Sequence, residues 1–142
     1  MKDKITIDDL DKAIAEQLNS YASDIRLKVH IVTDTAVRKL VQKTKKRAPK
    51  GVEGRKTRDG KNRIPGTFAK HITRTVEDNG VLGTKGIWHV NGDEYRLTHL
   101  LVHGHQLRQG GRTQGNDFLD KSVQEVSKEY FEELVKAVEK ID

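Results

Sequence analysis

Apolar side chains recur every three or four residues through the first third of the chain. The positions are Leu10, Ile14, Leu18, Tyr21, Ile25, Val29, Val32, Ala36 and Leu40. This is the spacing of one face of an α-helix, and no proline interrupts it. Basic residues and then Pro49 mark its end, so the pattern predicts a helix over residues 7–47.

A helix of that length is longer than the domain that would contain it. At 1.5 Å per residue it extends about 60 Å, whereas a globule of this mass is about 30 Å across. We therefore expect the helix to protrude or to pack on a neighbouring subunit. The residues predicted to form that subunit interface are Leu18, Ile25, Val29, Val32 and Leu40.

The apolar pattern disappears between residues 43 and 63, where positive charge takes its place. Ten basic residues stand against Glu53 and Asp59, a local net charge of +8, and three glycines lie among them. This composition predicts a flexible basic loop, centred on residues 48–66. The ten residues are Lys43, Lys45, Lys46, Arg47, Lys50, Arg55, Lys56, Arg58, Lys61 and Arg63.

A small sheet is predicted within residues 67–95. A helical turn at the start is followed by residues 72–76, in which Ile72, Arg74 and Val76 alternate with two threonines, and this pattern is typical of a strand. Asn79-Gly80 is typical of a hairpin turn, and a second strand is predicted from about Val81 to Val90.

Two further helices complete the predicted fold. A short helix over residues 96–104 ends at Gly104, and a longer one over residues 117–141 is capped by Asn116 or Asp117. The apolar stripe of the longer helix is Leu119, Val123, Val126, Tyr130, Leu134, Val138 and Ile141. The expected fold is one α+β domain, in which a long N-terminal helix and the C-terminal helix pack on a small antiparallel sheet of two to four strands.

Composition narrows the classes of function. The 142 residues are 34% apolar and 34% charged, with a net charge of +6, so the core is expected to be thin or completed by a partner. The absence of cysteine excludes a disulfide scaffold, thiol catalysis and cysteine-ligated zinc. No apolar run approaches the roughly 20 residues of a membrane span, and no secretory signal is expected.

Three histidines are the only cluster that suggests metal chemistry. His99 and His103 are four residues apart, the spacing of two ligands on one helix face, and His105 follows. A metalloprotease helix would place glutamate after the first histidine, where this chain has Leu100. A structural role is favoured over a metal or catalytic one. We expect no catalytic residues, no metal and no cofactor, and no enzymatic activity.

The basic loop admits three interpretations. It can order against an acidic surface of a partner protein, bind nucleic acid, or remain solvated. No aromatic residues are interleaved for base stacking, and no helix-turn-helix or zinc finger accompanies the loop. We therefore favour a partner protein, with nucleic acid as the next alternative.

Three stretches in this order resemble the small head–tail joining proteins of long-tailed bacteriophages, also called tail-completion or neck proteins. The first is the long helix ending in Lys46-Arg47-Ala48-Pro49, followed by a loop and residues 66–72. The most specific is the block around Leu97, His99, Leu100, Leu101, Gly104 and His105, which precedes Gly110-Gly111-Arg112. The third is Asp117-Phe118-Leu119 at the start of the last helix.

The resemblance implies a structural role. Proteins of this family assemble into a ring at the head–tail interface of the virion, and DNA passes through its lumen. The implied partners are other copies of this chain, other neck and tail proteins, and non-specific contact with packaged DNA. No membrane partner is implied. Assembly would take place in the bacterial host cytoplasm. The competing classes are a nucleic-acid-binding protein that uses the basic loop and a histidine metal-dependent hydrolase.

Overall fold

The long N-terminal helix has the bounds that the apolar spacing predicts. The computed structural model describes residues 7–51, 59–62, 64–80 and 83–140, with side chains from residue 9 onward. The elements are α1 (Ile7–Arg47), α2 (Thr67–Lys70), β1 (Ile72–Asp78), β2 (Thr84–Val90), the 3-10 helix η2 (Gly92–Leu97), α3 (Thr98–His103) and α4 (Phe118–Glu139). The predicted α+β class is confirmed.

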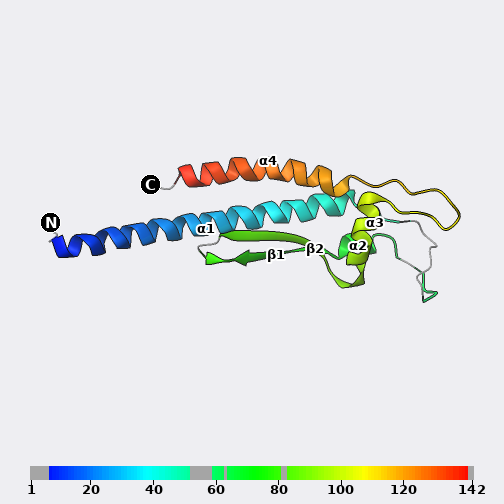
Figure 1. Ribbon diagram of the computed structural model, residues 1–142, viewed down its shortest axis with the longest axis horizontal. Coiled ribbons are helices and arrows are strands. Elements are labelled where there is room, and N and C mark those ends of the chain that lie inside the picture. The colour runs from blue at the N-terminus through cyan, green and yellow to red at the C-terminus, as the bar shows by residue number, and fades with distance from the viewer. Residues whose placement is uncertain (1–6, 52–58, 63, 81–82, 141–142) are drawn as a thin grey trace.

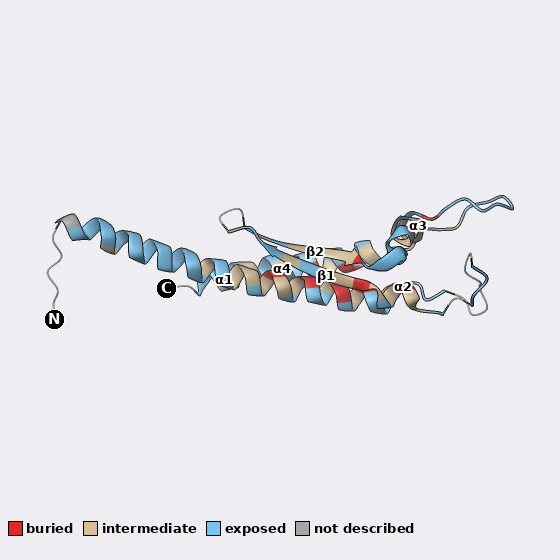
Figure 2. Ribbon diagram, turned by 90° about the horizontal axis from the view of Figure 1, so that it is seen from below, coloured by how far each residue is buried: buried red, intermediate tan, exposed pale blue. Residues whose placement is uncertain are grey.

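Helix α1 is the central element of the fold, and it packs against α4 on one side and against the β1–β2 hairpin on another. Figure 1 shows α4 running back along one side of α1 and the β1–β2 hairpin along another. Both cover only the C-terminal part of α1, and the N-terminal part extends past them (Figures 1 and 2). The domain is therefore elongated, with α1 shared between a helix pair and a helix–sheet contact.

The sheet is a two-stranded antiparallel hairpin. Ile72 pairs with Val90 at one end and Asp78 with Thr84 at the other. The second strand begins at Thr84, so the prediction that it starts near Val81 is wrong. The hairpin turn predicted at Asn79-Gly80 lies in the connection between the two strands. That connection spans residues 79–83, and the Asn79 amide donates to the Gly83 carbonyl across it at 2.9 Å.

The hairpin lies close to α1 because one strand position has no side chain. A methyl group on Gly86 would overlap Val37 of α1, and it would also crowd Thr33. Two polar contacts fix the same interface. Trp88 Nε1 donates to Thr44 Oγ1 at 2.9 Å, and Arg74 Nε donates to Asp34 Oδ1 at 2.9 Å.

The hydrophobic core sits at the C-terminal end of α1, where all the elements meet. Its buried members are Val41, Ala48, Phe68, Ile72, Val90 and Phe118. The rings of Phe68 and Phe118 meet edge to face with centroids 6.1 Å apart. Phe118 begins α4, and Asn116 positions it there because Asn116 Oδ1 accepts a hydrogen bond from the Phe118 amide at 2.9 Å.

The elongated shape leaves an unusually large area in contact with solvent. The chain exposes 10966 Å². A compact monomer of this mass exposes about 7400 Å², so the excess is about 3500 Å². Obligate interfaces bury about 2,000–5,000 Å² summed over both partners, which is about 1,000–2,500 Å² of each.

Candidate assembly surface

The N-terminal part of α1 carries an apolar face that no other described element of the chain covers. From Asp9 to Asp24 every side chain is exposed except Ala13, which is half-buried. The face consists of Leu10, Ile14, Leu18 and Tyr21, which are 46%, 47%, 61% and 44% exposed. We call these four residues the N-terminal stripe. Figure 2 shows this stretch of α1 in pale blue beyond the rest of the fold.

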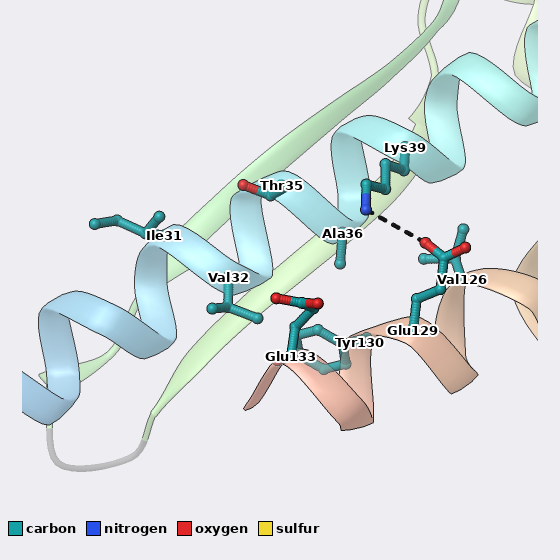
Figure 3. A pocket seen from close by; sticks show the side chains of 9 residues that line it. All are labelled: Ile31, Val32, Thr35, Ala36, Lys39, Val126, Glu129, Tyr130 and Glu133. Carbon is teal, nitrogen blue, oxygen red and sulfur yellow. Dashed lines mark hydrogen bonds and ion pairs between the residues drawn. The ribbon is translucent and has the colours of Figure 1, made fainter. Parts of the chain in front are cut away.

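The same face of α1 continues into the contact with α4. Val32 and Ala36 line an open groove of about 200 Å³ together with Val126 and Tyr130 of α4. Figure 3 shows the two helices facing each other across this groove, with Lys39 Nζ donating to Glu129 Oε2 at 3.3 Å on its rim. Deeper in the contact, Thr33 Oγ1 and the Tyr130 hydroxyl are 2.7 Å apart.

The structure therefore divides the predicted interface residues of α1 into two groups. Leu18 lies on the open N-terminal stripe. Ile25, Val29, Val32 and Leu40 are half-buried on the part of α1 that its own chain covers. Intramolecular packing accounts for much of the predicted stripe, and only its N-terminal end is left for a partner.

A second open apolar face lies on α4, and the sequence pattern did not reveal it. Val123, Phe131, Val135 and Val138 are 39%, 68%, 41% and 42% exposed. We call these four residues the α4 outer stripe. The predicted single stripe of this helix is wrong, because Val126 and Tyr130 line the groove with α1 whereas Val123 and Val138 are exposed. Phe131 and Val135, which are four residues apart and were both left out of the predicted stripe, were the signal that an outer face exists.

Four of the ten residues assigned to the basic loop belong to α1. Lys43, Lys45, Lys46 and Arg47 form its last turns, so placing them in a loop is wrong. They are helical because the apolar positions Leu40, Val41 and Ala48 continue to pack beside them. Lys45, Lys46, Lys50 and Lys61 are exposed. Arg55, Lys56, Arg58 and Arg63 lie outside the described residues.

Glu125 of α4 lies between two of these cations and joins the two helices. Its Oε1 accepts from Arg47 Nη2 at 2.8 Å, and its Oε2 accepts from Lys43 Nζ at 3.0 Å. Arg47 also donates to Ser122 Oγ at 3.1 Å. The hydrogen bonds from Arg47 and then Lys43 lower the pKa of Glu125 from 4.5 to about 2. Lys43 and Arg47 therefore hold α1 to α4.

We expect this carboxylate to make folding stability depend on acid. Because folding lowers the pKa of Glu125, its contribution is present above about pH 4.5 and disappears as the pH falls toward about 2. Glu125→Gln should unfold at a lower temperature than the wild type near neutral pH, and the difference should vanish near pH 2. Thermal unfolding followed by circular dichroism across this range measures it. Glu132→Gln, an exposed position on the same helix, is the control. A difference that is constant with pH would contradict the expectation.

The family-like block packs its leucines inward and presents its histidines to solvent. Leu97 and Leu101 pack against the core, and Leu100 is half-buried. His99, His103 and His105 are exposed, and His105 Nδ1 lies 3.1 Å from Thr113 Oγ1. Among the described residues, no group of three or more His, Cys, Asp or Glu side chains is placed to hold a metal ion.

Buried Gly104 ends α3 and lets two backbone segments meet. It has φ 76° and ψ 175°, and a methyl group there would overlap the Thr113 carbonyl oxygen. Gly115 lies equally close to the Val102 carbonyl on the other side of the contact. The Gly104 conformation is confined almost entirely to glycine. The glycines of this block thus serve chain packing.

Comparison of the chain with known protein families, with curated proteins and with solved structures gave no match. Within the described part of the chain, none of the helices combines the length and the apolar character needed to cross a membrane. What the protein does is therefore inferred from its shape, its two open apolar stripes and the distribution of its charge.

Proposed function

We propose that this chain is a structural subunit of the neck or tail of a long-tailed bacteriophage. Copies of it form a ring that completes the tail or joins it to the DNA-filled head. The observation that carries the proposal is the N-terminal stripe, four large apolar side chains on a helix that projects from its own fold. In an isolated chain these side chains stay in water, and burial against a neighbour stabilises the assembled form.

The exposed area supports an assembly subunit more than a monomer. The excess over a compact monomer, about 3500 Å², is enough for an obligate interface. The buried hydrophobic residues are few and gather at one end of α1, leaving its N-terminal end without a core of its own. Such a chain gains most of its remaining apolar burial from contact with other subunits.

The proposed partners and location come from the resemblance in the three sequence blocks. They are further copies of the chain, other neck and tail proteins, and packaged DNA passing through the lumen. The protein would be made in the host cytoplasm and retained in the virion. The role is structural and not enzymatic. Gly104 and Phe118, which belong to these blocks, are both buried.

Removal of one side chain from the N-terminal stripe tests the proposal. We expect the wild type to form rings visible by electron microscopy and a single large species by light scattering. Leu18→Asp should be a folded monomer, because burial of an unpaired carboxylate costs several kcal/mol. Asn19→Asp adds the same charge at an exposed neighbouring position off the stripe and should assemble like the wild type. A wild type that stays monomeric would refute the proposal.

Nucleic-acid binding is the second candidate function. It is favoured by Lys45, Lys46 and Lys50, which lie together at the C-terminal end of α1 and are exposed. A protein that holds DNA through such residues loses affinity steeply as salt rises. If the wild type is monomeric by light scattering and binds duplex DNA with this salt dependence, nucleic-acid binding is the function and the ring proposal is wrong.

A further inference from the structure

We propose that the N-terminal stripe of one subunit docks on the α4 outer stripe of the next, so that copies join head to tail. This inference rests on the proposed function and goes beyond it by naming the two surfaces. The occupant of each open stripe is a second copy of the same chain. Leu18 and Phe131, the most exposed residues of the two stripes, mark their centres.

The first argument is continuity with a contact the fold already makes. The face of α1 that bears Leu18 is the one that, further along, meets α4 of its own chain at Val32 and Ala36. That face is therefore shaped for a helix with apolar residues three and four apart. Where its own α4 ends, the face continues uncovered (Figure 1). The α4 outer stripe of another copy is also an open apolar helix face, distinct from the face with Val126 and Tyr130 that its own α1 occupies.

The second argument is that the two stripes match in size and composition. The N-terminal stripe extends from Leu10 to Tyr21, about 17 Å along the helix, and the α4 outer stripe from Val123 to Val138, about 22 Å. Each carries one aromatic and three aliphatic side chains that are between 39% and 68% exposed. Two helices of this kind pack with their axes about 8–10 Å apart.

The geometry also determines the kind of assembly. The two stripes are different surfaces, on different helices, and each subunit has one of each. A contact between unlike surfaces is heterologous, so every subunit can bind one neighbour on either side. Such contacts close into a ring when the rotation between neighbours permits. A contact of the N-terminal stripe with itself would stop at a dimer.

Disulfide trapping tests the pairing, because the chain has no cysteine of its own. Leu18→Cys is mixed with a longer, tagged Phe131→Cys chain, and the mixture is oxidised. Docked subunits hold the two thiols at an effective concentration on the order of mM, so the mixed disulfide should form at least about tenfold faster than in the control. The control replaces Leu18→Cys with Lys12→Cys, which lies on another side of the same helix and is exposed.

Each other outcome has a definite meaning. Rapid formation of the Leu18→Cys homodimer with little mixed product would show that two N-terminal stripes pair, and would overturn the inference. Oligomers of normal size without either disulfide would also overturn it while leaving the proposed ring in place. A protein that is monomeric by light scattering would refute the inference together with the proposed function.

Discussion

Phe118→Ala should lower the free energy of unfolding by about 3–5 kcal/mol, since it removes a fully buried aromatic ring and leaves a cavity. Phe118 is 1% exposed and contacts Phe68 edge to face. It is also the first residue of α4, so its ring anchors that helix where the core elements meet. A loss of this size should reduce the melting temperature by roughly 10 °C or more in a domain of this length.

The matched control lies on the same helix. Phe131→Ala makes the same change at a side chain that is 68% exposed. In dilute samples, where subunits are separate, it should leave the melting temperature close to that of the wild type. In assembly assays Phe131→Ala should have the larger effect of the two variants, provided that both chains are folded, because Phe131 belongs to the α4 outer stripe. Equal losses of stability in the two variants would show that Phe118 does not anchor the core.

Gly104→Ala is the second change with a large expected effect. The conformation of Gly104 is nearly inaccessible to other residues, which alone costs about 1–3 kcal/mol. A methyl group would in addition overlap the Thr113 carbonyl oxygen, a backbone atom that cannot move without shifting its chain. We expect α3 to separate from the segment that leads into α4, with faster amide hydrogen exchange in α3 and a lower melting temperature.

Alanine variants of two other glycines distinguish the cost of the backbone conformation from the cost of the steric overlap. Gly110→Ala introduces a side chain at a positive φ of 92° but into open space, so it isolates the backbone effect. Gly115→Ala has no such φ but overlaps the Val102 carbonyl, so it isolates the steric effect. Gly104→Ala should exceed both. If it were no more harmful than Gly110→Ala, close packing of this block would not be what requires glycine.

The elements with strong local patterns were predictable from the sequence. The bounds of α1 follow from an uninterrupted apolar spacing and the basic turn before Pro49. The helix ended by Gly104 and the helix that begins beside Asn116 were predicted by their terminal residues. In each case the signal lies within a few residues of the boundary, where backbone sterics and local hydrogen bonds decide the conformation.

The candidate assembly surface was only partly predictable. An apolar stripe on α1 was evident, but periodicity reports that a face is apolar without saying what covers it. The covering α4 meets α1 at Val32 and Ala36, and this leaves Leu18 open. On α4 the sequence merged two faces into one stripe, because Val123 and Val126 are only three residues apart although one is exposed and the other buried.

By itself, the sequence determined that this protein is an α+β chain with a helix too long for its own core. It also determined where that helix ends and that its surface is charged. Only the tertiary structure decided that Lys43 and Arg47 bind Glu125 rather than belong to a loop, and that Gly86 lets the hairpin approach Val37. The reason is that each of these contacts joins two residues that are between 49 and 82 positions apart in the sequence. Local conformational propensity carries no information about which distant residue will pair with a charge or fill a space.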